Sequence, residues 1–176
     1  MKMKFCGRNW AAAAVLALAL CLTACGPNMR ASESVPADTE GDLGTTLSTM
    51  FFDYTVLSAE SPSAYDGYTA LEGKKLLVCS VNVKNDFGEA LPMYASDFWL
   101  QWGEGDEDYA WPVDPFTDRM TPLEYELADR AEVTYDLLFE VPADQNEFAL
   151  VYLEEYYDAD GNDCTGKFYS AYFTLQ

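Results

Sequence analysis

Apolar and polar residues alternate in three segments of this chain. The clearest covers residues 132–141, where every second residue from Val133 is apolar. The same period appears over residues 52–56 and 77–83. A period of two turns one set of side chains toward a core and the other toward water, so each segment is predicted to be a half-buried strand.

Four further apolar runs continue the pattern, separated by turn-forming clusters rich in Gly, Asn and Asp. The runs lie at residues 97–103, 108–113, 147–156 and 167–175. Residues 122–129 (PLEYELAD) alone suggest one helical turn. About seven short strands with no long helical period predict an all-β fold, an antiparallel β-sandwich.

The first 24 residues have the pattern of a signal peptide. Lys2, Lys4 and Arg8 precede an unbroken apolar run at residues 11–20. A helix that spans a bilayer needs about 20 apolar residues, so this shorter run is typical of a signal-peptide core. Residues 1–24 are therefore predicted to direct export.

The tetrapeptide LTAC at residues 22–25 follows this core and resembles the lipobox of bacterial lipoproteins. In those proteins the Cys receives a diacylglyceryl group and becomes the first residue of the mature chain. The resemblance implies lipidation of Cys25 and an anchor at the extracytoplasmic face of the cell membrane. The lipid would be the only membrane attachment, and no other cofactor is expected. An ordinary secretory signal is the alternative interpretation.

Residues 25–49 are rich in Gly, Pro, Ser, Thr and acids and have few large apolar side chains. Such a segment buries too little surface to offset the entropy lost on ordering, so it is predicted to be a flexible acidic linker behind the lipidated Cys25. Residues 50–176 are long enough for one core and are predicted to form one β-sandwich domain.

Several of the predicted strands together resemble a known family. Residues 72–85 (EGKKLLVCSVNVKN) have the Gly-Lys start, the alternating Val and the closing Val-Lys-Asn found in telokin-like domains of secreted Gram-positive lipoproteins. Residues 95–100, 138–142 and 148–152 resemble later strands of that family in order and spacing, whereas residues 128–131 lack the glycine of its turn. The family shares an immunoglobulin-like sandwich with a secreted mycobacterial immunoprotective antigen. The resemblance implies an immunoglobulin-like fold and brings no catalytic residues.

Charge and histidine content narrow the functions that this domain can have. The chain has 10 Lys+Arg against 30 Asp+Glu, a net charge of −20, and no His. Such a charge repels phosphate groups, which argues against nucleic acid or anionic lipid headgroups as partners. Without His, a Ser–His or Cys–His nucleophile pair is excluded. These observations favour a non-catalytic interaction or ligand-binding module with an envelope protein or a glycan as partner.

Cys79 and Cys164 are the two thiols expected to remain after signal removal and lipidation. Cys79 falls in a predicted strand and Cys164 in a predicted late hairpin turn. A disulfide between them is therefore not expected, although export would permit one.

Trp99 and Trp111 are candidate ligand-binding residues near the tip of a predicted hairpin. A three-residue loop at residues 104–106 would set Trp99 opposite Trp111 as an exposed aromatic platform for a sugar ring or a peptide. A two-residue loop would pair Phe98 with Trp111 and bury the latter. Packing in the core or at its rim is the alternative role of these rings. A carbohydrate-binding module is thus a second functional hypothesis.

Asp158, Asp160 and Asp163 are candidate calcium ligands in an acidic turn, where they would steady such a module. Carboxylate oxygens suit this hard cation. The twelfth position counted from Asp158 is Tyr169 and not the Glu of an EF-hand, and a polar hairpin turn is the competing interpretation.

A carboxylate-dependent hydrolase is the third hypothesis, since 30 acids bring some carboxyl pairs together. Such an enzyme needs one carboxyl with a raised pKa in an apolar pocket and a second that stays ionised. The sequence marks no acid as buried, and no catalytic residue is assigned.

Overall fold

The computed structural model describes residues 37–105 and 107–175. Cys25, the predicted signal peptide and residues 25–36 of the predicted linker lie outside these ranges. The strands are β1 (Thr39–Asp42), β2 (Thr46–Ser48), β3 (Phe52–Glu60), β4 (Lys74–Asn85), β5 (Leu91–Tyr94), β6 (Phe98–Gln101), β7 (Tyr109–Ala110), β8 (Glu124–Leu127), β9 (Glu132–Pro142), β10 (Glu147–Tyr157) and β11 (Asp163–Thr174). One turn of 3-10 helix, η2 (Ala95–Asp97), joins β5 to β6. Helices that are long and apolar enough to cross a membrane are absent from the described residues.

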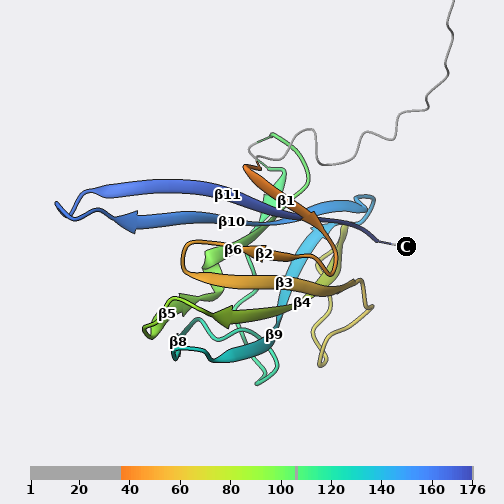
Figure 1. Cartoon of the computed structure of the whole chain (residues 1–176). Helices are drawn as coiled ribbons and strands as arrows, with labels where there is room; N and C mark the ends of the chain where they lie inside the picture. Colours follow the sequence, from red (N-terminus) through yellow and green to blue (C-terminus); the bar gives the residue numbers. More distant parts are fainter. Residues whose placement is uncertain (1–36, 106, 176) are drawn as a thin grey trace, which may run out of the picture.

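The strands form two principal sheets, one above the other in Figure 1. The first has the order β1-β11-β10-β6-β7 and the second the order β2-β3-β4-β9, while β5 and β8 form a separate pair. Neighbouring strands are antiparallel except β1, which runs parallel to β11. The predicted all-β sandwich is confirmed. The described residues hold eleven strands where about seven were predicted, because several strands of two to four residues join the longer ones.

The alternating segments supply the core between the two sheets. Phe139 of β9 and Tyr54 of β3 are buried, and they face Leu100 of β6 and Leu150 of β10. Leu138 points the other way and packs in a smaller cluster that covers the outer face of the second sheet. Burial of each large apolar side chain contributes about 1.5–3 kcal/mol, so these residues fix how the sheets stack.

The structured domain extends to the N-terminal side of residue 50. β1 and β2 lie in the part of residues 25–49 that the composition assigned to the flexible linker. β1 joins the first sheet by main-chain pairing with β11, and the Asp38 N–H donates to the Phe168 carbonyl at 2.9 Å. Main-chain pairing needs no apolar side chain, so the polar composition of this segment did not indicate the two strands.

The predicted helical turn at residues 122–129 is a strand instead. β8 pairs with β5, and Leu91 lies opposite Leu127. Leu127 is buried and Tyr125 is partly buried, while Leu123 is exposed. Leu123 and Leu127 have a helix-like spacing, but pairing with β5 stabilises a strand in which Tyr125 and Leu127 both face the core.

Cys79 and Cys164, the two cysteines among residues 37–105 and 107–175, are both free. Cys79 is buried in β4, and burial raises the pKa of its thiol. Cys164 is half-buried and is the second residue of β11, not a turn residue as predicted.

Asn85, the last residue of β4, ties the second sheet to the β5–β8 pair. Its side chain is fully buried. The Nδ2 donates to the carbonyl oxygens of Glu89 at 2.7 Å, Leu127 at 2.8 Å and Ala128 at 3.2 Å. The Oδ1 accepts the Phe87 N–H at 2.8 Å. One side chain thus satisfies main-chain groups of two turns.

Replacing Asn85 by alanine is expected to lower the free energy of unfolding by about 2–4 kcal/mol, because buried main-chain groups lose their partner. Asn82→Ala on the same strand is the matched control. The Asn82 amide donates to Glu132 and Thr134 in exposed positions, so its loss should cost less than about 1 kcal/mol. Chemical denaturation of both variants measures the two free energies of unfolding. Equal losses of free energy would contradict the role of Asn85 in joining the second sheet to the β5–β8 pair.

Candidate functional site

Trp99 of β6 and Trp111, just after β7, face each other at one edge of the first sheet. Gln101 pairs with Tyr109 across this hairpin. The same register continues to Trp99 opposite Trp111 and excludes a pairing of Phe98 with Trp111. The two indole rings have centroids 5.9 Å apart and planes inclined at 53°. Of the two loop lengths that the sequence left open, the structure thus has the register of the three-residue loop.

Asp108 holds the loop that fixes this register. Its carboxylate accepts the Gly105 N–H at 2.9 Å, and its carbonyl oxygen accepts the Trp102 N–H at 2.9 Å. A Cβ atom at Gly103 or Gly105 would collide with the Asp108 carboxylate. Glycine at these two positions therefore leaves room for the Asp108 side chain to lie against the main chain of the loop.

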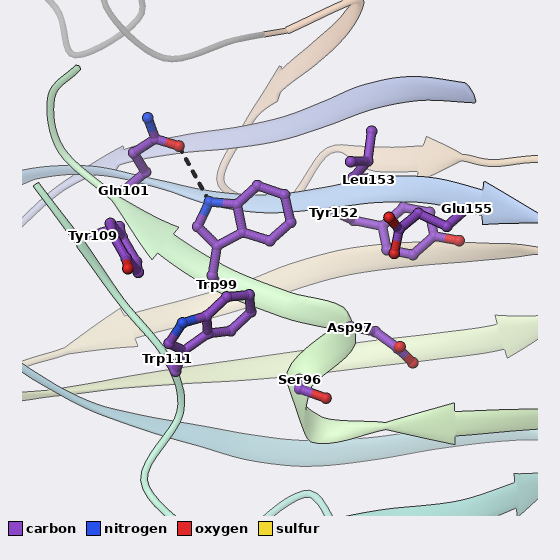
Figure 2. A pocket seen from close by; sticks show the side chains of 9 residues that line it. All are labelled: Ser96, Asp97, Trp99, Gln101, Tyr109, Trp111, Tyr152, Leu153 and Glu155. Carbon is purple, nitrogen blue, oxygen red and sulfur yellow. Dashed lines mark hydrogen bonds between the residues drawn. The ribbon is translucent and has the colours of Figure 1, made fainter. Parts of the chain in front are cut away.

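The two indoles line a hollow of about 420 Å³ (Figure 2). Its other lining residues are Ser96, Asp97, Gln101, Tyr109, Tyr152, Leu153 and Glu155. The volume lies within the range of small-ligand sites. Figure 2 shows the two Trp rings in the middle, Tyr109 and Gln101 at one end, and Asp97 and Glu155 at the other.

Trp99 forms a fixed wall of this hollow. Its indole Nε1–H donates to the Gln101 Oε1 at 3.1 Å, and the Gln101 Nε2 donates to the Gly103 carbonyl at 2.8 Å. The ring also packs against Ala149 and Val151 on the outer face of the first sheet. With its only donor occupied, the Trp99 side chain offers the hollow an aromatic surface and no free hydrogen-bond donor.

Trp111 forms the open wall. Its side chain is 53% exposed, and Tyr109 packs on it edge to face with ring centroids 6.2 Å apart. Since Trp99 is only half-buried, neither Trp belongs to the core. The predicted aromatic platform is therefore present as a surface feature; its use in binding stays a prediction.

Asp97 and Glu155 supply the charge of the hollow. Asp97 ends η2, and its Oδ2 accepts the Tyr94 N–H at 2.7 Å. Burial, and then the nearby Glu155 charge, raise the pKa of Asp97 to about 6 against the opposing effect of the Tyr94 N–H. The nine described residues that line the hollow include no Lys or Arg to neutralise either carboxyl.

Sequence reasoning missed both acids, although Asp97 begins the apolar run at residues 97–103 and Glu155 lies within the run at residues 147–156. Those runs were assigned to strands from their apolar residues, and no role was considered for the acids within them. A signal for Asp97 was present: its carboxyl lies three residues after Tyr94 and caps the main chain there, the spacing typical of a capping box. Nothing comparable marked Glu155. The sequence therefore did not indicate that two acids, Asp97 and Glu155, line one hollow.

A second hollow of about 610 Å³ adjoins the first and shares Tyr109 and Trp111 with it. It lies where the edge strands of the two sheets, β7 and β9, meet. Trp102 adds a third indole to the lining of this second hollow. The hollow is also lined by an ion pair, in which the Lys74 Nζ lies 3.9 Å from the Glu140 Oε2. Tyr109 and Trp111 therefore form a ridge with an aromatic-lined hollow on each side.

A third hollow, on the outer face of the second sheet, has three of its four charged lining residues already engaged with partners: Asp66, Arg119 and Asp136. Arg119 contacts Asp66 at 3.0 Å and lies 4.8 Å from the centre of the Tyr65 ring. The Tyr65 hydroxyl donates to Asp136 at 2.7 Å, and burial with this hydrogen bond raises the pKa of Tyr65 to about 12. These groups satisfy one another, so the hollow is a weaker candidate.

The aspartates predicted to bind calcium lie at the tip of the β10–β11 hairpin. Asp158 accepts the main-chain N–H groups of Asp160 and Asn162, each at 2.9 Å, which holds the turn. Among the described residues no group of three or more acidic or Cys side chains is placed to hold a metal ion. The structure therefore does not gather Asp158, Asp160 and Asp163 into one site.

Comparison with known proteins gives similarity in structure but not in sequence. No protein-family model matches the chain, and no curated protein matches it. MPT63, a secreted protein from Mycobacterium tuberculosis, matches with a TM-score of 0.51 and 13% identity over 77% of this chain and 95% of its own. The chain shares the β-sandwich fold of MPT63.

Two Bacillus subtilis proteins have the same β-sandwich fold. The yjhA protein matches with a TM-score of 0.53 and 17% identity over 74% of this chain and 98% of its own. The ycdA protein, provisionally described as a lipoprotein, matches with a TM-score of 0.52 and 23% identity over 72% of this chain. The match spans only 38% of ycdA. The resemblance inferred from the predicted strands is thus confirmed for the fold, and identities this low carry no further property across.

Proposed function

We propose that this protein is a lipid-anchored, extracytoplasmic binding module that holds a carbohydrate chain at the Trp99–Trp111 hollow without catalysis. The observation that carries the proposal is the pair of Trp rings, 5.9 Å apart, lining a surface hollow with one ring largely exposed. Trp99, Tyr109 and Trp111 together form a contiguous aromatic patch around this hollow, and such a patch is typical of a ligand-binding surface.

The chemistry of the hollow suits a sugar. A pyranose ring presents C–H groups on its faces, which pack against an aromatic ring, and hydroxyl groups at its rim, which need polar partners. Gln101, Asp97 and Glu155 place such partners at the two ends of the indole surface. The second hollow beyond Tyr109 and Trp111 provides room for further sugar units, which supports a chain over a single sugar.

The location is part of the proposal. Cys25 would carry the lipid, and the chain from there to Thr39 spans at most roughly 45–50 Å when fully extended. The hollow would therefore lie close to the membrane surface, where envelope glycans are within reach.

Replacing Trp111 by alanine is expected to weaken binding of penta-N-acetylchitopentaose by about tenfold or more, because Trp111 walls both hollows. Tyr157→Ala is the control, since Tyr157 is an exposed aromatic residue near the hairpin tip. Tryptophan fluorescence and calorimetric titration give the affinities. Unchanged affinity in the Trp111 variant would remove the hollow as the binding site.

A carboxylate-dependent hydrolase is the second candidate, favoured by the raised pKa of Asp97 beside Glu155 in one hollow. The Asp97 carboxyl, however, already caps the main chain at Tyr94. Prolonged incubation with the same oligosaccharide, followed by separation of the products by size, distinguishes the two. Shorter fragments that disappear in Glu155→Gln would establish the hydrolase.

A further inference from the structure

The acidic end of the aromatic hollow has properties that a neutral sugar does not explain. Asp97 and Glu155 line the same end, and the charge of Glu155 acts on the half-buried Asp97. Two carboxylates near each other in a partly dehydrated site repel, and no cation among the lining residues offsets that repulsion. Sugar hydroxyls would donate hydrogen bonds to these carboxylates but would leave both charges in place.

A positively charged group at this end would relieve the repulsion. An ammonium group has three N–H donors and forms charge-assisted hydrogen bonds with carboxylates. The adjoining Trp99 and Trp111 rings attract a cation as well, since the face of an indole is negative. The chain as a whole carries a net charge of −20, which draws cationic ligands toward its surface.

We propose that the ligand is an amino-sugar chain with free amines, and that the Asp97–Glu155 end of the hollow binds one protonated amine while Trp111 stacks on a sugar ring. This inference rests on the proposed carbohydrate-binding function and specifies its ligand class. The amine would lie beyond the edge of the Trp99 ring, where Figure 2 shows the two carboxyl groups.

Two pentasaccharides that differ only in their amines test this proposal. Fully deacetylated chitopentaose carries free amines, and penta-N-acetylchitopentaose carries none. The wild-type protein is expected to bind the deacetylated chain about tenfold more tightly at low salt near neutral pH. Added salt should reduce that preference and leave the affinity for the acetylated chain unchanged.

The variant Asp97→Asn/Glu155→Gln is expected to bind both chains with the affinity of the wild type for the acetylated one. Asn retains an oxygen for the Tyr94 N–H, and Glu155→Gln alone, at an exposed position, provides a second variant that does not touch the turn. Glu72→Gln/Asp144→Asn removes the same charge from exposed positions away from the hollow and should keep the preference.

Each other outcome overturns the proposal in a recognisable way. Equal wild-type affinities for the two chains, or a preference that survives in both acid variants, would refute amine recognition and leave carbohydrate binding intact. Loss of the preference in the Glu72/Asp144 control would trace it to net charge. Failure of both chains to bind wild-type protein would remove the proposed function together with this inference.

Discussion

Exchanging Cys25 for alanine is expected to move most of the protein from the membrane fraction into the medium. The thermal stability of the β-sandwich should stay at the wild-type value. A buried acyl chain contributes about 0.8 kcal/mol per CH₂, and two chains are enough for stable anchoring. The remainder of the chain is strongly acidic and is repelled by anionic headgroups. The lipid would therefore carry the whole attachment.

Fractionation of a bacterium that processes lipoproteins, with immunodetection of the full chain, measures this effect. Cys21→Ala is the matched control because it removes a nearby thiol of the predicted signal peptide and leaves the lipobox intact. Thermal unfolding of the released Cys25 variant checks the fold. Retention of that variant on membranes at the wild-type level would show that another part of the chain holds it there.

The long strands of this fold could be predicted because a strand between two layers buries one face. Residues 77–83 and 132–141 alternate in the sequence, and they lie in β4 and β9. The short strands gave no such signal. β1 is an edge strand attached through its main chain to β11, and β8 gains its stability from pairing with β5. Pairing of this kind depends on distant segments and leaves almost no mark on local composition.

The candidate site could be predicted in part. Trp99 and Trp111 were recognisable as a pair, yet two loop lengths left their register open. The carboxylate of Asp108 against Gly103 and Gly105 favours one of them, and this contact cannot be read from residue types. Glu155 follows an irregularity in β10 at which the register with β11 shifts. Such a bulge changes which side chains face the core, so period counting assigns no face to Glu155.

The same bulge turns Glu154 inward and makes it a buried anchor. Its Oε1 accepts the Met50 N–H at 2.7 Å and the Tyr169 hydroxyl at 2.8 Å, and its Oε2 accepts the Lys167 N–H at 3.1 Å. A Cβ at Gly166 would lie 2.5 Å from Oε2, so glycine makes room for the carboxylate. Burial by itself raises the pKa of Glu154, but these hydrogen bonds and the Lys167 charge outweigh it and hold the pKa below its ordinary value.

Replacing Glu154 by alanine is expected to lower the free energy of unfolding by about 3–5 kcal/mol, because three donors lose a charged acceptor in a buried position. Glu155→Ala, its exposed neighbour, should change that free energy by less than about 0.5 kcal/mol. Urea denaturation of both variants measures the contrast. Similar values for the two would show that the bulge does not depend on the buried carboxylate.

The stabilisation by Glu154 should also depend on pH with a defined sign. Since the folded state lowers the pKa of Glu154, its contribution is complete above the unfolded value of about 4.3 and is lost as the pH falls through the lower folded value. Glu154→Gln keeps the size of the side chain but cannot ionise. The difference in unfolding free energy between wild type and this variant is therefore expected to be constant near neutral pH and to narrow below about pH 4. A difference that stays constant through the acid range would mean that hydrogen bonding and not charge holds β11 to the turn at Met50.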